Sequence, residues 1–153
     1  MHLSDLLDDE LLMPKTVCTS KDEIINKLIE RIYGTKLEFP LLRQEMTKTI
    51  YIRELIGGTV LPSGLAIPHA RIKNYKGFIL ALGTPAGPIF QDGIQIRMIA
   101  LMITSQSGSP WYLPVLGALT KLSRDSAYFS RLYGAETTEK FKTILKERDA
   151  ELD

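Results

Sequence analysis

The ten residues 95–104 read QIRMIALMIT, and they decide how the rest of the chain is arranged. Six of them, Met98 to Ile103, form the longest continuous apolar stretch of the sequence. A shorter run, FILAL at residues 78–82, is bounded by Gly77 and Gly83. Short continuous apolar runs are typical of strands that are covered on both faces. We therefore predict a central sheet with helices on both sides.

Two predicted helices precede these strands. Ser20 followed by Glu23 resembles a capping box, and apolar residues recur after it at helical spacing, which predicts a helix over 21–33. Pro40 can occupy the first turn of a second helix over 40–56 that ends at Gly57-Gly58. Its expected buried side consists of Leu42, Met46, Ile50 and Leu55.

Between the second helix and the first apolar run, Pro62-Ser63-Gly64 predicts a turn that joins short extended segments at 59–60 and 65–67. Gln91-Asp92-Gly93 predicts the turn before the run 95–104, and a polar loop without periodicity follows that run.

Three further helices are expected after the loop. One carries Leu113, Leu116, Leu119 and Leu122, the next covers 126–133, and Thr137 caps a last helix from Thr138 to about Glu151. Lys140, Lys142, Lys146 and Arg148 are interpreted as the solvated face of that last helix. The order of elements indicates a layered α/β (α+β) arrangement with a central sheet, whose strand order the sequence leaves open. We predict three layers, α/β/α, with a central mixed sheet of about five strands.

Composition excludes several classes of protein. The 153 residues carry 19 Lys+Arg and 18 Asp+Glu, a net charge of +1 that argues against nucleic-acid binding. No stretch approaches the ~20 apolar residues that span a bilayer, so direct membrane insertion is not expected. The acidic N-terminus lacks a basic region followed by an apolar one, so no signal peptide is expected, and Cys18 is the single cysteine. We expect one cytoplasmic domain over residues 1–153.

His69 is the strongest candidate for chemistry. It ends the segment GLAIPH at residues 64–69, where Pro68 biases Ile67 to an extended conformation and fixes the backbone before the ring. This placement predicts an imidazole at the end of a strand, where sheets tend to present functional groups. A structural role for a lone His is the alternative that the residues leave open.

Two other site chemistries fit less well. His69 has no second His, Cys or carboxylate nearby at metal-ligand spacing, so no zinc site or other metal site is predicted. Ser63 with His69 as its base would suggest a hydrolase, but the G-x-S-x-G elbow is missing and no acid is evident to orient the His.

The segment RELIGGTVLPSGLAIPH, residues 53–69, resembles the signature of enzyme IIA domains of the bacterial phosphoenolpyruvate-dependent sugar phosphotransferase system, of the fructose, mannitol and nitrogen-related type. The family pattern reads R-E-x-x-G-S-T-x-x-x-x-G-[IV]-A-I-P-H. Gly58 replaces the usual Ser, and Pro62 replaces a usual Gly. Further similarities extend from Leu3 to Asp125, so the resemblance covers nearly the whole chain.

The resemblance implies a phosphocarrier, and hence a phosphotransferase without a cofactor. His69 would accept a phosphoryl group from phospho-HPr and pass it to a cysteine of an enzyme IIB domain. Arg53 matches the motif Arg and would hold phosphoryl oxygens, with a helix-surface salt bridge as the alternative. Thr59 would either donate its hydroxyl or cap a turn.

One departure affects the expected site. The family usually has a second His at the start of the helix that follows the polar loop, and Tyr112 stands there in this chain. A Tyr can donate a hydrogen bond to phosphate but carries no positive charge, and packing against the sheet is its alternative role. The departure leaves a regulatory enzyme IIA of the nitrogen type, acting on protein partners, as the alternative function. A divergent binding protein that no longer accepts phosphate is the third reading.

Overall fold

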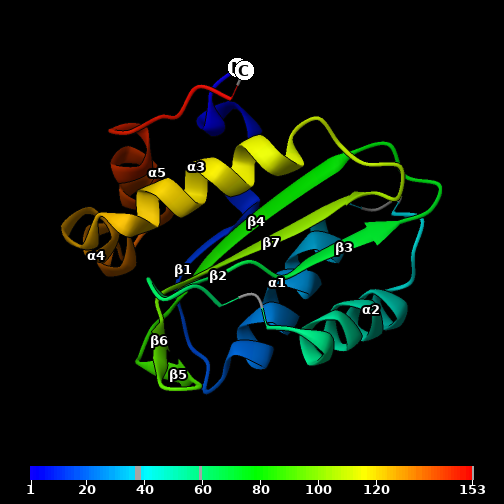
Figure 1. The fold of residues 1–153 in the computed structure, drawn as a ribbon, viewed down its shortest axis with the longest axis horizontal. Coiled ribbons are helices and arrows are strands. Elements are labelled where there is room, and N and C mark those ends of the chain that lie inside the picture. The colour runs from blue at the N-terminus through cyan, green and yellow to red at the C-terminus, as the bar shows by residue number, and fades with distance from the viewer. Residues whose placement is uncertain (37–38, 59, 153) are drawn as a thin grey trace.

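The computed structural model describes residues 1–36, 39–58 and 60–152. Its strands are β1 (Leu12–Thr16), β2 (Leu65–Ala66), β3 (His69–Ile72), β4 (Phe78–Pro85), β5 (Ile89–Gln91), β6 (Ile94–Ile96) and β7 (Met98–Ser105). Its α-helices are α1 (Lys21–Thr35), α2 (Arg43–Ile56), α3 (Tyr112–Arg124), α4 (Ser126–Gly134) and α5 (Thr138–Lys146), as Figure 1 shows. Two short 3₁₀ turns, η1 (Leu3–Leu6) and η2 (Asp9–Leu11), precede β1.

A mixed sheet of five strands forms the middle of the fold, in the order β1-β4-β7-β2, with β3 also paired to β7. The two long strands β4 and β7 are antiparallel, from Phe78 opposite Thr104 to Gly83 opposite Ile99. The remaining neighbours run parallel, β1 to β4 and both β2 and β3 to β7. The predicted mixed sheet of about five strands is confirmed, and β7 is the strand on which β2, β3 and β4 all depend.

Both faces of the sheet are covered, as the apolar runs predicted. Side chains of β4 and β7 alternate between two clusters, so that Leu80, Leu82 and Met102 pack with α3, α4 and α5. Their neighbours Ala81 and Leu101 pack with α1 and α2 instead. Figure 1 shows these two helical layers on opposite sides of the strands. All eight residues of β7 are buried, which explains why its sequence shows no polar alternation.

The first helix follows its sequence signals closely. The Ser20 hydroxyl accepts a hydrogen bond from the Glu23 amide at 3.1 Å, and the apolar stripe of α1 from Ile24 to Ile32 is buried. The helices predicted over 126–133 and around Leu113–Leu122 are also present. An N-terminal cap and a regular stripe are therefore enough to locate these helices.

The second helix was predicted too long and with too wide a buried side. α2 begins at Arg43, because Leu42 is extended at its N-cap and Pro40 lies before the helix. Met46 and Ile50 are buried as expected, whereas Leu42 and Leu55 are 67% and 68% exposed. Leu55 lies about 140° round the helix from Ile50, so the two cannot share one face.

The last helix ends at Lys146 instead of Glu151. The residues after it contact the N-terminal segment, where the amide of Leu3 donates to the carbonyl of Ala150 at 2.8 Å and the amide of Leu152 donates to that of Met1 at 2.8 Å. Pairing with the opposite terminus replaces the hydrogen bonds of a further helical turn, and Figure 1 shows the two ends side by side.

The strands contain three differences from the sequence prediction. The run 95–104 is split at Arg97, whose amide donates to the carbonyl of Gly64, and only Met98–Ser105 lies in the main sheet. β1, β3 and β5 were not predicted, and β5 forms a separate hairpin with β6. An extended segment was expected at 59–60. Thr59 lies outside the described residues, and Val60 forms only an isolated bridge with Ala66.

Gly64 should be far less tolerant of substitution than Gly93. Both have positive φ, 93° and 80°, but a Cβ on Gly64 would overlap the Gln95 carbonyl oxygen, whereas nothing lies near one on Gly93. We expect Gly64→Ala to lower the free energy of unfolding by about 2–4 kcal/mol and Gly93→Ala by about 1 kcal/mol in urea denaturation. Equal losses would show that the backbone contact to Gln95 contributes nothing.

Candidate functional site

The candidate site is built on the edge of the sheet formed by β2 and β3. Leu65 pairs with Met98 and His69 with Met102, so both segments keep the same register on β7. Pro68 has no amide hydrogen to donate, which interrupts the ladder, although its carbonyl still accepts from the amide of Met102 at 3.0 Å. His69 therefore begins β3, and the prediction that it ends a strand is wrong.

Strand alternation places the His69 side chain on the α3 side of the sheet. Leu65 and Ile67 belong to the cluster that includes α3, and Ala66 and Ala70 belong to the cluster on the α1 and α2 side. Consistent with this, the rings of His69 and Tyr112 are 5.4 Å apart and inclined at 57°. The half-buried imidazole thus lies beside the first residue of α3.

One hydrogen bond determines which ring nitrogen of His69 is available. Nδ1 lies 3.3 Å from the carbonyl oxygen of Ile67. A carbonyl oxygen only accepts, so Nδ1 carries the hydrogen in this bond. In the neutral ring Nε2 is then left with a lone pair, which is what a nucleophilic nitrogen needs.

The surroundings of His69 favour the neutral ring. Burial lowers the pKa of His69 most strongly, and the positive charges of Arg53 and Arg71 lower it further. The hydrogen bond to the Ile67 carbonyl and the negative charge of Glu54 act in the opposite direction. The net pKa lies below the ordinary value, so near neutral pH Nε2 is unprotonated.

Arg53 lies in the last turn of α2, close enough to His69 for its charge to affect the imidazole. Its Nη1 donates to the carbonyl oxygen of Gly57 at 3.1 Å, at the C-cap of the helix. A guanidinium has five N–H donors, so this bond leaves others available for an anion. The structure thus brings together His69, Arg53 and Tyr112, which are far apart in the sequence.

The other two hydroxyl residues considered for the site are Thr59 and Ser63. Thr59 lies outside the described residues. The Ser63 hydroxyl forms its hydrogen bonds away from His69. It donates to the Ser123 hydroxyl at 2.9 Å and accepts from the amide of Leu65. The hydroxyl that a hydrolase would use is therefore part of the turn before β2.

Residues 5–148 match the sequence profile of the family described as "Phosphoenolpyruvate-dependent sugar phosphotransferase system, EIIA 2". The chain belongs to this family. The matched residues include the signature segment 53–69 that carried the resemblance, and they extend over most of the chain.

The relatives of this chain include a component of a PTS system and nitrogen regulatory proteins. The chain is 25% identical over 153 residues to the PTS system 2-O-alpha-mannosyl-D-glycerate-specific EIIABC component of Escherichia coli K12, covering 97% of this chain but only 23% of that protein. It is 25% identical over 154 residues to a nitrogen regulatory protein of Klebsiella oxytoca, covering 96% and 91% of the two chains.

A solved structure shares the enzyme IIA fold. It is the Escherichia coli complex of enzyme IIA for mannitol with phosphorylated enzyme IIB, which matches with a TM-score of 0.70 at 16% identity over 93% of this chain and 98% of that one. At this level of identity the likeness concerns the fold.

Three exposed apolar residues that the sequence analysis did not single out as exposed follow Arg53 and Tyr112 in the chain. Leu55 and Ile56 follow Arg53 on α2 and are 68% and 79% exposed, and Leu113 follows Tyr112 on α3 and is 70% exposed. Periodicity assigned Leu55 and Leu113 to the helical stripes of the core. Only their position relative to the sheet shows that they face solvent.

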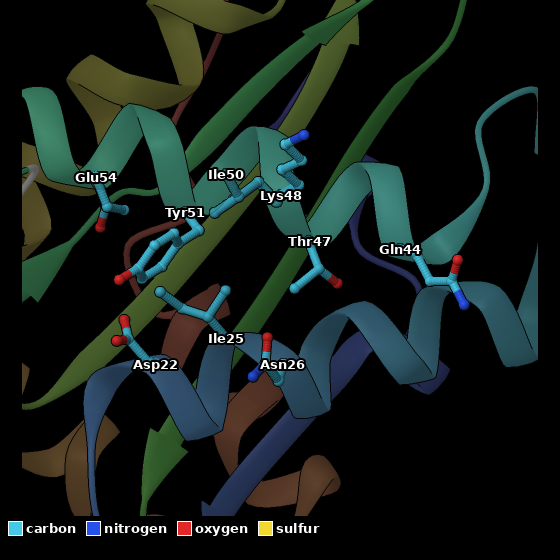
Figure 2. A pocket seen from close by; sticks show the side chains of 9 residues that line it. All are labelled: Asp22, Ile25, Asn26, Gln44, Thr47, Lys48, Ile50, Tyr51 and Glu54. Atoms are coloured by element: carbon cyan, nitrogen blue, oxygen red, sulfur yellow. The ribbon is translucent and has the colours of Figure 1, made fainter.

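A pocket of about 420 Å³ lies elsewhere, in the groove between α1 and α2 (Figure 2). Its lining includes Ile25 and Ile50, with Asp22, Tyr51 and Glu54 at one end, but not His69.

Among the described residues no helix is both long and apolar enough to cross a bilayer, and no group of three or more His, Cys, Asp or Glu side chains is placed to hold a metal.

The electrostatics of His69 lead to a titration experiment. Because burial and two arginines lower the pKa of His69, we expect its ring signals in NMR to titrate with a midpoint below the ordinary value of about 6.5. Arg53→Gln removes one of the positive charges and should raise the midpoint. The signals are assigned by their loss in His69→Gln, and a wild-type midpoint above 6.5 would contradict this description of the site.

Proposed function

We propose that this enzyme IIA chain is a phosphocarrier in which His69 accepts a phosphoryl group from an HPr-like phosphohistidine donor. The observation that carries the proposal is the hydrogen bond from Nδ1 of His69 to the Ile67 carbonyl, which leaves Nε2 as the nucleophile. The lowered pKa supports it, because the attacking nitrogen must be unprotonated.

The chemical step is a displacement at phosphorus. Nε2 of His69 donates its lone pair to the phosphorus and forms a new N–P bond, while the N–P bond of the donor breaks and its electron pair returns to the donor's imidazole. Nδ1 keeps its hydrogen on the Ile67 carbonyl throughout, so the accepting ring needs no proton transfer. Positioning and charge stabilisation are then the protein's main contributions.

Arg53 and Tyr112 are proposed to support the phosphoryl group. Arg53 is near enough to act on His69 electrostatically and has free donors for phosphoryl oxygens. Tyr112 lies against the imidazole, and its hydroxyl is a neutral donor. Thr59 keeps the phosphate-supporting role that the family resemblance implies.

Protein partners fit the site better than a small substrate. The described pocket between α1 and α2 does not include His69, whereas Leu55, Ile56 and Leu113, which follow Arg53 and Tyr112 in the sequence, are exposed. Apolar side chains around a reactive group favour docking of another protein surface. We propose an HPr-like donor and the cysteine of an enzyme IIB domain as acceptor, with the whole exchange in the cytoplasm and residues 1–153 acting as one domain.

A regulatory enzyme IIA is the second candidate. The relative of Klebsiella oxytoca, which is named a nitrogen regulatory protein, is matched over 91% of its length. Tyr112 in place of the family's second His is a further reason, because a slower transfer to enzyme IIB suits a protein whose phosphorylation state is read by partners. In both candidates His69 carries the phosphoryl group.

The direct test is incubation with phosphorylated HPr, followed by measurement of acid-labile protein-bound phosphate. We expect labelling of the wild type and none of His69→Gln. Onward transfer to an enzyme IIB domain within seconds favours the transport role, and a phosphorylated chain that transfers slowly favours the regulatory one. An unlabelled wild type, or equal labelling of His69→Gln, would refute the phosphocarrier proposal.

Substitution of Tyr112 tests whether this position takes part in transfer. Tyr112→His restores a group that can be positively charged and should increase the rate of phosphorylation severalfold, because charged donors stabilise phosphoryl oxygens better than neutral ones. Tyr112→Phe keeps the ring beside His69 and removes only the hydroxyl. Rates equal to wild type in both variants would assign Tyr112 to packing alone.

A further inference from the structure

A buried ion pair joins α1 to α2 close to the candidate site. Nζ of Lys21, the first residue of α1, lies 3.0 Å from Oε1 of Glu54 in the last turn of α2. The two side chains are only 4% and 7% exposed. Removing one partner of a buried pair is costly, because the other charge stays in a poorly solvated place.

The pair holds the turn of α2 that carries Arg53. Glu54 is the next residue in the chain, and the residues after it, Leu55 and Ile56, are exposed. Figure 2 shows Glu54 at one end of the open groove between the two helices. The ion pair is thus a direct tie between α1 and the end of α2, where Arg53 must be placed beside His69.

The pair also balances charge around His69. Arg53 on α2 and Arg71 on β3 supply positive charge, Glu54 supplies negative charge, and Tyr112 of α3 lies against the ring as a neutral neighbour. A phosphoryl group adds about 1.5–2 negative charges at neutral pH. The Glu54 carboxylate repels such a group unless a nearby cation offsets it, and the Lys21 ammonium is 3.0 Å from that carboxylate.

We propose that Lys21 is a positioning residue for phosphoryl transfer, which holds Glu54 and the adjoining Arg53 turn beside His69 and offsets the Glu54 charge when His69 is phosphorylated. The proposal rests on the phosphocarrier function proposed above. Lys21 touches no reacting atom and acts through Glu54 and Arg53.

The first arm of the test uses the unphosphorylated chain and is independent of that function. Lys21→Met removes the ammonium that lies 3.0 Å from the Glu54 carboxylate, so the negative charge near His69 is less offset and the NMR titration midpoint of His69 should move upward. Glu54→Gln should move it downward, and Lys21→Met with Glu54→Gln should bring it back towards wild type. Lys27→Met is the matched control, because Lys27 also lies on α1 and pairs with an acid, Glu23, but both side chains are about 40% exposed.

The second arm measures the phosphorylated chain. With phospho-HPr, Lys21→Met should reach an equilibrium level of phosphorylation about tenfold lower than wild type, an effect of the size expected for breaking one charge interaction in a buried site. The double variant should recover part of the loss, because the Glu54 charge is removed while the tie between the helices stays broken, and Lys27→Met should behave as wild type. Thermal unfolding monitored by circular dichroism shows which variants remain folded.

The two arms separate the possible failures. If Lys21→Met and Lys27→Met have the same effect on both readouts, or if the double variant recovers nothing, Lys21 only ties the helices together and the inference is wrong. If the wild type takes no phosphate from phospho-HPr, the proposed function fails. If the His69 titration midpoint is the same in Lys21→Met as in wild type, the charge coupling is wrong as well.

Discussion

The pairing of β2, β3 and β4 with β7 is the constraint on which the rest of the structure depends. β7 is buried along its whole length and alternates its side chains between two helical layers, so its neighbours must keep register with it. Pro68 breaks the ladder at one point without shifting that register. The carbonyls of Gly64 and Pro68 accept from amides of β7, so by strand alternation the Ile67 carbonyl points away from β7 and is available to Nδ1 of His69. A backbone feature of the edge thus sets the chemistry of a side chain.

The groups around His69 come from different parts of the fold, and each layer contributes one. β3 presents the imidazole, α2 supplies Arg53 from one side, and α3 places Tyr112 against the ring. The buried tie between Lys21 and Glu54 links the α2 contribution to α1. The net charge of +1 gives little long-range electrostatic steering, so in the proposed function docking of a partner depends on the local surface around His69.

Sequence reasoning succeeded where one local signal was sufficient. The capped and regularly striped α1, the two-face-buried strands and the layer order were all predicted, and the motif around His69 led to the family. It failed where tertiary contacts decide. The last helix stops at Lys146 because the following residues pair with the N-terminus, which no local pattern records. Leu55 was predicted to be buried from helical spacing. Its exposure depends on where α2 lies against the sheet, which the spacing does not show.

The residues of the candidate site could be proposed from the sequence, but their geometry could not. Arg53 and His69 were proposed from the motif and Tyr112 from the position of the family's second His, yet the tautomer of His69 follows only from the 3.3 Å contact with the Ile67 carbonyl. The Lys21–Glu54 pair joins residues 33 positions apart in sequence. Lys21 starts the first helix and Glu54 follows the motif Arg, but no local sequence pattern predicts that their side chains form an ion pair.

In the proposed phosphocarrier, the hydrogen bond to the Ile67 carbonyl makes Nε2 of His69 the nucleophile. The one-bond coupling between ³¹P and ¹⁵N in the phosphorylated chain, with ¹⁵N-labelled histidine, tests this directly. We predict coupling to Nε2, with Nδ1 still carrying its hydrogen. Coupling to Nδ1, or phosphate attached to a residue other than His69, would contradict the account.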